Sequence, residues 1–160
     1  MDDLVIAAEP FESDDARRLI SELDGGLAQL YTPEQRFGPN FKADQITGGR
    51  GTFLIARVGG RAVGCGAIRV LDGTTAEVKR MYVEPELRGR RVGRAVLDAL
   101  EEQARGLGVQ RLVLETGIHQ HAAIALYTHA GFTQCDCWGE YTSSPTSVCY
   151  EKAINVQPRS

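Results

Sequence analysis

Hydrophobic and polar positions along the chain follow two periods, one typical of strands and one typical of helices. Residues 4–10 form a short, mostly apolar run that predicts a strand. Ser13 is a residue type that caps helices, and the apolar positions between Ala16 and Leu23 recur on one side of a helical pattern. The chain therefore begins with a predicted strand that is followed by a helix.

Three further runs predict an antiparallel meander over residues 52–83. Residues 52–58 and 61–71 are apolar runs joined by a Gly-Gly pair, which favours a two-residue hairpin turn. An Asp-Gly turn then leads to residues 76–83. This third strand ends before Pro85, because proline cannot donate a hydrogen bond to a sheet.

The C-terminal half predicts two helices and a buried strand. From Val92 to Ala104 an apolar residue recurs at every fourth position with charged residues between, which predicts an amphipathic helix. Residues 111–116 are nearly all apolar, as in a strand buried between helices. Residues 122–131 predict a last helix that a glycine ends.

The remaining segments complete the predicted domain. Residues 132–138 and 147–154 predict two closing strands, whereas residues 32–51 show no period and carry the glycines and prolines of a loop, with room for a short helix. No repeat or linker interrupts the chain. Residues 1–160 therefore predict a single domain of the α/β or α+β class around one mixed sheet.

Composition narrows the choice of function. The 160 residues are 42% hydrophobic, which is enough for a core without disulfides or metal, and the net charge of −3 argues against a basic nucleic-acid surface. No apolar run approaches the ~20 residues that span a bilayer, and the N-terminus is acidic, so we expect a cytoplasmic protein without membrane contact. No C-x-x-C pair occurs. Reduced, buried thiols are expected at the four cysteines, Cys65, Cys135, Cys137 and Cys149.

An arginine-rich segment between a predicted strand and a predicted helix indicates an anion site. Its residues are Arg88, Gly89, Arg90, Arg91, Val92, Gly93 and Arg94. Free N–H groups and the positive end of the helix dipole favour phosphate there, and the spacing fits neither a nucleoside triphosphate loop nor a dinucleotide fingerprint. A pyrophosphate on another carrier fits better; a solvated arginine-rich turn is the alternative.

This segment resembles the R/Q-x-x-G-x-G/A signature of the GNAT superfamily of N-acetyltransferases. EVKRMYV resembles the fourth strand of the family, RLVLET the fifth, and AIALYTHAGF its last helical segment, so the resemblance covers roughly residues 50–155. It is closest to an uncharacterised branch, resembling small-molecule and amino-acid acetyltransferases, with LETG, a C-terminal tyrosine and Pro-x-S-V. The resemblance implies a mixed, mostly antiparallel sheet of about six to seven strands with helices on both faces.

The resemblance also implies a cofactor and its contacts. Acetyl-CoA would be the acyl donor, with its pyrophosphate on residues 88–94. The main chain of Met81, Tyr82 and Val83 would hold the pantetheine and the thioester carbonyl. Two positions depart from the family pattern: Arg91 stands where the signature prefers a glycine, and Gln120 stands where many members have an asparagine that contacts the cofactor.

Acetyl transfer to an amine also needs a base for the amine and an acid for the departing thiolate. Tyr127 matches the family tyrosine that protonates the thiolate. Glu77 matches the position of the general base in histone-modifying members, although Lys79 lies on the same face of its strand and could hold it in an ion pair. Glu115 and ordered water are the other bases left open.

Other reactive side chains predict no further chemistry. His119, His121 and His129 share no ligand-type spacing with a carboxylate or cysteine, so no metal is expected. Cys65 could form an acetyl-enzyme, but no adjacent histidine would activate it. Direct transfer to the acceptor is therefore the predicted mechanism.

The acceptor is left open by the sequence. We expect it to contact residues 32–51 and 135–147, because variable loops carry specificity on a fixed scaffold. The side chains proposed for this contact are Arg36, Lys42 and Arg50 for a carboxylate, and Tyr31, Trp138 and Tyr141 for an apolar group. A small-molecule, amino-acid or peptide amine is the predicted substrate; a non-catalytic acyl-CoA-binding module and a protein-lysine acetyltransferase are the alternatives. A homodimer is the commonest assembly on symmetry grounds.

Overall fold

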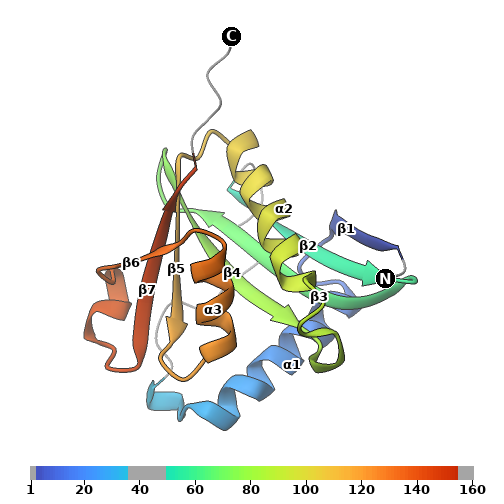
Figure 1. The fold of residues 1–160 in the computed structure, drawn as a ribbon, viewed down its shortest axis with the longest axis horizontal. Coiled ribbons are helices and arrows are strands. Elements are labelled where there is room, and N and C mark those ends of the chain that lie inside the picture. The colour runs from blue at the N-terminus through green and yellow to red at the C-terminus, as the bar shows by residue number, and fades with distance from the viewer. Residues whose placement is uncertain (1–2, 36–49, 155–160) are drawn as a thin grey trace.

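The computed structural model describes residues 3–35 and 50–154, and its centre is a mixed sheet of seven strands (Figure 1). The strand order is β1-β2-β3-β4-β5-β7-β6, and β4 and β5 are the one parallel pair of the described sheet. The predicted class, mixed and mostly antiparallel, is confirmed. The strands are β1 Leu4–Ala8, β2 Gly51–Val58, β3 Arg61–Val70, β4 Thr75–Val83, β5 Arg111–Gly117, β6 Thr133–Cys135 and β7 Ser147–Ala153.

The predicted meander forms because its turns carry the right residues. Gly59 and Gly60, between β2 and β3, both have positive φ (58° and 84°), as a tight hairpin turn requires. In the turn before β4, the carboxylate of Asp72 accepts hydrogen bonds from the backbone N–H groups of Thr74 and Thr75. These turns align β2, β3 and β4 as antiparallel neighbours.

Two helices, α2 (Val92–Gly106) and α3 (His121–His129), cover one face of the sheet (Figure 1). The predicted apolar positions of α2 are all buried, and each fully buried aliphatic side chain contributes about 1.5–3 kcal/mol. Gly66 of β3 lets α2 approach closely, because a Cβ atom there would lie 2.9 Å from side-chain atoms of Val96 and Leu100. The middle of α2 therefore packs directly against β3.

Helix α1 (Asp14–Leu30) covers the opposite face. The Ser13 hydroxyl accepts a hydrogen bond from the N–H of Ala16 and so caps the helix as predicted. Ala16 and Leu19 pack with Phe53 and other small apolar side chains of β2 and β3 in a second core cluster. After α1, the predicted loop begins with a short 3-10 helix, η1 (Pro33–Gln35), while residues 36–49 lie outside the described part of the chain.

The C-terminal segment corrects one prediction. Cys137 and Cys149 form a disulfide, so these two cysteines are not the reduced thiols that the sequence analysis expected. Pairing of β6 with β7 places Cys135 opposite Cys149 and brings Cys137 within a Cα–Cα distance of 5.2 Å, which a disulfide can span. Cys65 is a buried free thiol, and Cys135 is free but only partly buried.

The first predicted closing strand is also shorter than expected. Strand β6 has three residues, and the chain continues into a 3-10 helix, η4 (Gly139–Ser143), before β7 begins. No helix among the described residues is long and apolar enough to cross a membrane.

Candidate active site

Strands β4 and β5 separate toward their C-terminal ends. Their pairing extends only from Thr75 to Glu77 on β4, and beyond this point the two strands make no further pairs. The backbone groups of β4 that face β5 are therefore left for another partner over its second half. Met81, Tyr82 and Val83, the predicted main-chain contacts of a thioester, lie on this separated stretch.

Strand β4 also carries a bulge in this stretch. The β3–β4 register shifts between Cys65 and Ala67, and Arg80 on the opposing strand has a φ of 57°. The thiol of Cys65 donates a hydrogen bond to the carbonyl oxygen of Arg80 at 3.3 Å. Bulges redirect side chains near functional sites. No glycine on β4 signals this bend, although Gly66 lies opposite it on β3.

The predicted anion site is a turn that leads directly into α2. A short 3-10 helix, η3 (Pro85–Leu87), precedes it, and the first backbone hydrogen bond of α2 runs from the N–H of Ala95 to the carbonyl of Arg91. Within the described structure, the backbone N–H groups of residues 91–94 have no acceptor. They lie at the positive end of the helix dipole, the arrangement that binds phosphate groups.

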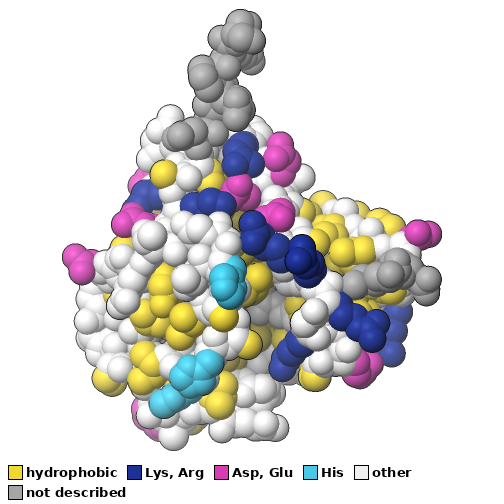
Figure 2. All heavy atoms as spheres, viewed as in Figure 1, with side chains coloured by type: hydrophobic (Ala, Val, Ile, Leu, Met, Phe, Trp, Pro, Cys, Tyr) yellow, Lys and Arg dark blue, Asp and Glu magenta, His cyan; other side chains and the backbone are white. Residues whose placement is uncertain are grey.

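The four arginines of this turn differ in their contacts. The guanidinium of Arg88 donates to the carbonyl oxygen of Val83 at 3.0 Å, and Arg94 donates to Asp98 at 3.0 Å. Arg90 and Arg91 are exposed, and their side chains have no partner among residues 3–35 and 50–154. Figure 2 shows Lys and Arg side chains gathered on this face of the molecule, around the start of α2. The site thus combines free amides with two uncommitted cations.

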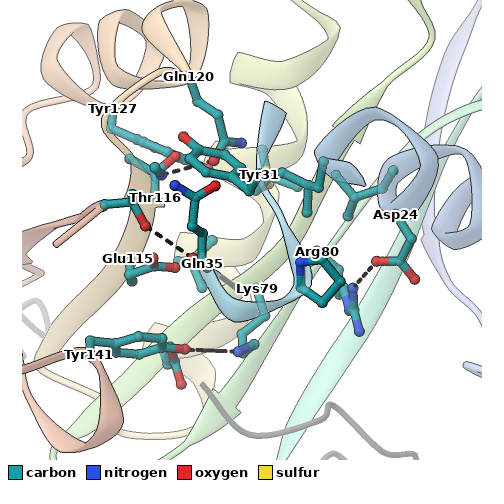
Figure 3. Close-up of a pocket in the computed structure, with 18 residues that line it drawn as sticks. Asp24, Tyr31, Gln35, Lys79, Arg80, Glu115, Thr116, Gln120, Tyr127 and Tyr141 are labelled. Atoms are coloured by element: carbon teal, nitrogen blue, oxygen red, sulfur yellow. Dashed lines mark hydrogen bonds and ion pairs between the residues drawn. The ribbon is translucent and has the colours of Figure 1, made fainter. Parts of the chain in front are cut away.

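A cavity of about 520 Å³ adjoins the separated strands, between α1, β4, β5 and η4. Figure 3 shows Tyr127 and Gln120 at one end of it, Lys79 and Tyr141 at the other, and Arg80 beside Asp24. The ionisable side chains in its lining are Asp24, Tyr31, Glu77, Lys79, Arg80, Glu115, Tyr127 and Tyr141. The structure therefore brings both predicted catalytic residues, Tyr127 and Glu77, to one cavity.

Tyr127 reaches the cavity from α3. It is buried, and its ring packs edge-on against Phe132 with the ring centres 5.9 Å apart. Burial, with a smaller effect of the charge on Glu115, raises the pKa of Tyr127 above its ordinary value. The phenol is therefore neutral at physiological pH and keeps a proton that it can donate.

Glu77 lies at the centre of a closed network. Its Oε1 accepts from Arg69 Nε at 3.2 Å, its Oε2 accepts from the Tyr141 hydroxyl at 3.0 Å, and Lys79 Nζ lies 3.8 Å from Oε2. The Glu77 side chain is only 2% exposed. Both oxygens are thus occupied, and a substrate amine could reach neither without displacing a partner.

Glu115 on β5 is more accessible. The hydroxyl of Ser147 donates to Oε2 at 2.6 Å, and no other hydrogen bond holds this carboxyl among the described residues. Burial raises the pKa of Glu115, whereas the Ser147 hydrogen bond and the charge on Lys79 oppose that shift. Of the two carboxylates, Glu115 has the free oxygen.

Tyr31 reaches this cavity from the end of α1, and its hydroxyl accepts a hydrogen bond from the N–H of His119 at 3.0 Å. A Cβ atom at Gly117 would overlap the Tyr31 hydroxyl, so the glycine of the LETG motif makes room for this side chain. Gln120 is engaged locally, because its Oε1 accepts from the N–H of Gly117 at 2.8 Å. The side-chain oxygen of Gln120 therefore holds the last residue of β5 and is not free to contact a cofactor without giving up this hydrogen bond.

Other sequence-based hypotheses have different outcomes. Tyr31 and Tyr141 line the cavity, whereas Arg36 and Lys42 lie outside the described residues. Within ranges 3–35 and 50–154, no cluster of three or more His, Cys, Asp or Glu side chains could hold a metal ion. The sequence indicated no specific role for Arg80, and the ion pair of Arg69 with Glu77 was not predicted. This pair could have been found from the sequence, since a hairpin centred on Gly73 places Arg69 and Glu77 opposite each other.

Comparison with known proteins relates this geometry to a family. The sequence pattern of the acetyltransferase (GNAT) family matches residues 19–132. The "IAA acetyltransferase" of Azospirillum brasilense is 40% identical over 157 residues, which cover 96% of this chain and 100% of that protein.

Solved structures have the same fold. An acyl-CoA N-acyltransferase candidate from Klebsiella pneumoniae has a TM-score of 0.82 and 35% sequence identity, covering 95% of this chain and 98% of the other. A GNAT family acetyltransferase from Elizabethkingia anophelis with acetyl-CoA bound has a TM-score of 0.69 over 96% of this chain and 100% of the other, with 18% identity, so this likeness concerns the fold alone.

Proposed function

The chain belongs to the acetyltransferase (GNAT) family, and from that premise we propose that it transfers the acetyl group of acetyl-CoA directly to the primary amine of a small molecule, an amino acid or a peptide. The observation that carries this proposal is that the second half of β4 is paired with β3 on one side and with no strand on the side that faces β5. This stretch begins at the cavity, at Met81, and ends at Val83, whose carbonyl oxygen accepts a hydrogen bond from Arg88 of the anion-site turn at 3.0 Å. The stretch therefore lies between the ionisable side chains of the cavity and the turn that precedes α2.

The described residues fit acetyl-CoA. The free amides of residues 91–94 and the uncommitted side chains of Arg90 and Arg91 would hold the pyrophosphate, and the main chain of Met81, Tyr82 and Val83 would hold the pantetheine end. Acetyl-CoA supplies an acetyl group already activated as a thioester. The acetyl-CoA complex of the fold neighbour from Elizabethkingia anophelis supports this choice. For the predicted contact with the cofactor, the Gln120 side chain would have to bind both the cofactor and the N–H of Gly117.

Tyr127 is the proposed acid. Its phenol is buried beside the cavity, and the raised pKa keeps the proton on the hydroxyl at neutral pH. The departing sulfur would take this proton as the C–S bond breaks, so that coenzyme A leaves as a neutral thiol and Tyr127 regains its proton from solvent afterwards. A general acid of this kind contributes typically ~10²–10⁴-fold to rate.

Glu115 is the proposed base in place of Glu77. The sequence analysis favoured Glu77 and left Glu115 open, but Glu77 is enclosed by Arg69 and Tyr141, whereas Glu115 has an uncommitted oxygen beside the same cavity. A carboxyl with a raised pKa is also better matched to accept a proton near neutral pH. Glu77 is then a positioning residue that holds Tyr141 and Lys79.

Direct transfer is favoured over an acetyl-enzyme. Cys65 is the free cysteine nearest in sequence to the bulge, but it is fully buried, and burial raises the pKa of its thiol to about 12. A thiol that remains protonated is a poor nucleophile. The amine of the acceptor is therefore the group that receives the acetyl.

The experiment that tests the function measures release of free thiol from acetyl-CoA with a panel of primary amines, and identifies the acetylated product by mass. Tyr127→Phe should lower kcat at least ~10-fold while leaving acetyl-CoA affinity unchanged, because it removes a proton but little packing volume. No thiol release with any amine would refute the proposed transfer. An unchanged kcat in Tyr127→Phe, where chemistry limits the rate, would assign Tyr127 to packing.

The extent of the domain and the location of the protein are also proposed. Residues 1–160 are proposed to act as one domain, with the acetyl-CoA-binding part over about residues 50–155. The cytoplasm remains the proposed location. Disulfides such as Cys137–Cys149 persist mainly in oxidising compartments, so in the cytoplasm these two cysteines would be kept reduced.

A further inference from the structure

Two neighbouring residues of β4, Lys79 and Arg80, both line the cavity. Consecutive side chains of a regular strand point to opposite faces of the sheet. Here the bulge opposite Gly66 and the positive φ of Arg80 turn its side chain to the same cavity as that of Lys79. The bend thus lets two consecutive cationic residues line one cavity, with Lys79 directed toward Tyr141 and Arg80 toward Asp24 (Figure 3).

Arg80 has features that its role in the fold does not explain. A left-handed backbone is unfavourable for any residue with a Cβ atom. Its Nε atom is buried and has no hydrogen-bond partner, and within the described structure the guanidinium makes one hydrogen bond, from Nη1 to Asp24 at 2.9 Å. The side chain keeps 20% of its surface exposed. A strained residue with unused donors beside a cavity indicates a binding role.

Lys79 also has donors to spare. Its Nζ donates to the Tyr141 hydroxyl at 3.1 Å and lies 3.8 Å from Glu77 Oε2, while an ammonium group carries three donors. Burial lowers the pKa of Lys79 despite the opposing charge of Glu77. An additional anion in the cavity would favour its charged form.

Each of the two cations is paired with one carboxylate of the cavity, Arg80 with Asp24 and Lys79 with Glu77, and each keeps donors that these carboxylates do not take. Asp24 is already bonded to Arg80, and Glu77 is enclosed by Arg69 and Tyr141. Glu115 lies on β5, across the separated strands from Arg80. The cavity therefore presents cations on β4 and an accessible carboxylate on β5, an arrangement that complements a zwitterion.

We propose that the acceptor is an amine that also bears a carboxylate, as a free amino acid does, and that Arg80, assisted by Lys79, binds this carboxylate while the amine faces Glu115. This inference rests on the proposed acetyl transfer and narrows its substrate class. A cavity of about 520 Å³ is of the size that holds a small molecule. Arg80 is suited to the task, because its Nη2 makes no hydrogen bond among the described residues and its Nη1 carries a second hydrogen besides the one that Asp24 takes.

The first test compares amino acids with their α-amides, which keep the side chain and the amine but lose the negative charge. Because an amide also changes the basicity of the amine, the informative quantity is the acid-to-amide ratio of kcat/KM in each protein. Arg80→Gln should lower this ratio at least tenfold relative to the parent. Arg111→Gln, an exposed arginine that pairs with Glu151 at the other end of β5, should leave the ratio unchanged.

A second variant separates binding from folding. Arg80→Gly removes the guanidinium but adopts a positive φ freely, so the bulge should persist. Calorimetry with coenzyme A should give parental affinity for this variant. With the protein saturated by coenzyme A, amino acids should bind to the parent at least tenfold more tightly than to Arg80→Gly, whereas the amides should bind equally to both.

These outcomes distinguish the two proposals. If no amine is acetylated but the parent alone binds amino acids in preference to amides, acetyl transfer is refuted and the carboxylate site stands. If amines are acetylated and the acid-to-amide ratio is the same in the parent, Arg80→Gln and Arg80→Gly, the carboxylate site is overturned while the transfer stands.

Discussion

Replacing Arg91 with glycine should stabilise the protein. Arg91 is the N-cap of α2 and has a φ of 67°, in the left-handed region that costs a residue with a Cβ atom roughly 1–2 kcal/mol. Glycine avoids this cost but loses roughly 0.5–1 kcal/mol through its greater freedom in the unfolded chain. The expected net gain is about 0.7 kcal/mol, the middle of a range of about 0–1.5 kcal/mol, and it raises the Tm of a domain of this size by roughly 1–3 °C.

The same substitution should leave cofactor affinity nearly unchanged. The free amides at residues 91–94 stay in place, because they belong to the main chain. What is lost is one exposed guanidinium, and an exposed ion pair contributes about 0–1 kcal/mol. The affinity for coenzyme A should therefore fall by less than roughly fivefold. A gain in stability with retained binding would show that the main chain holds the anion.

Thermal unfolding without ligand and calorimetry with coenzyme A measure the two effects. Arg90→Gly is the matched control, because Arg90 is an exposed arginine of the same turn whose φ is not positive. Its Tm should be unchanged or lower. The reasoning is refuted if Arg91→Gly unfolds below the parent, or if both variants shift alike. A loss of coenzyme A affinity beyond ~10-fold in Arg91→Gly would show that the side chain is the main contact.

Two further predictions concern the cavity and the disulfide. Glu115→Gln should lower kcat/KM most at pH values just above the raised pKa of Glu115, where the parent carboxylate can act as the base. The loss should be smaller at lower pH, where the parent carboxyl is protonated, and at high pH, where the amine arrives deprotonated. Glu77→Gln should keep the parental shape of this pH profile, and the opposite result would restore Glu77 as the base. For the disulfide, thiol titration in denaturant without reductant should find two thiols, Cys65 and Cys135, and four reactive thiols would contradict the bond. The double variant Cys137→Ser, Cys149→Ser should lower the free energy of unfolding by about 2–4 kcal/mol, as expected for a closed loop of this length.

Much of the fold could be predicted because its signals are local. The fourfold spacing from Val92 to Ala104 predicts a helix, and these positions are buried against the sheet. The Gly-Gly and Asp-Gly turns predict two hairpins, and they fix the register of β2, β3 and β4. The anion site follows in the same way, because an arginine-rich turn before a strong helix places free amides and cations together.

The parts that could not be predicted depend on contacts between distant segments. In the order β5-β7-β6, the last strand of the chain lies between β5 and the edge strand β6, and this arrangement brings Cys137 to Cys149. Tyr31 reaches His119 across 88 positions of sequence. The bulge at Arg80 has no local signal, since arginine between lysine and methionine fits a regular strand. Tertiary packing overrides the local preference at this point.

Arg80 and Arg91 are the two non-glycine residues with positive φ in the described ranges; Arg80 lines the cavity, and Arg91 directly precedes α2. The strain at the two residues has different explanations. At Arg91 the family signature prefers glycine, so the turn needs no side chain there, and the exposed guanidinium adds only a weak contact to the anion. At Arg80 the guanidinium is bonded to Asp24 and lines the cavity, so the side chain gives a reason to retain the strained backbone. Glycine should therefore preserve cofactor binding at the first position and remove acceptor recognition at the second.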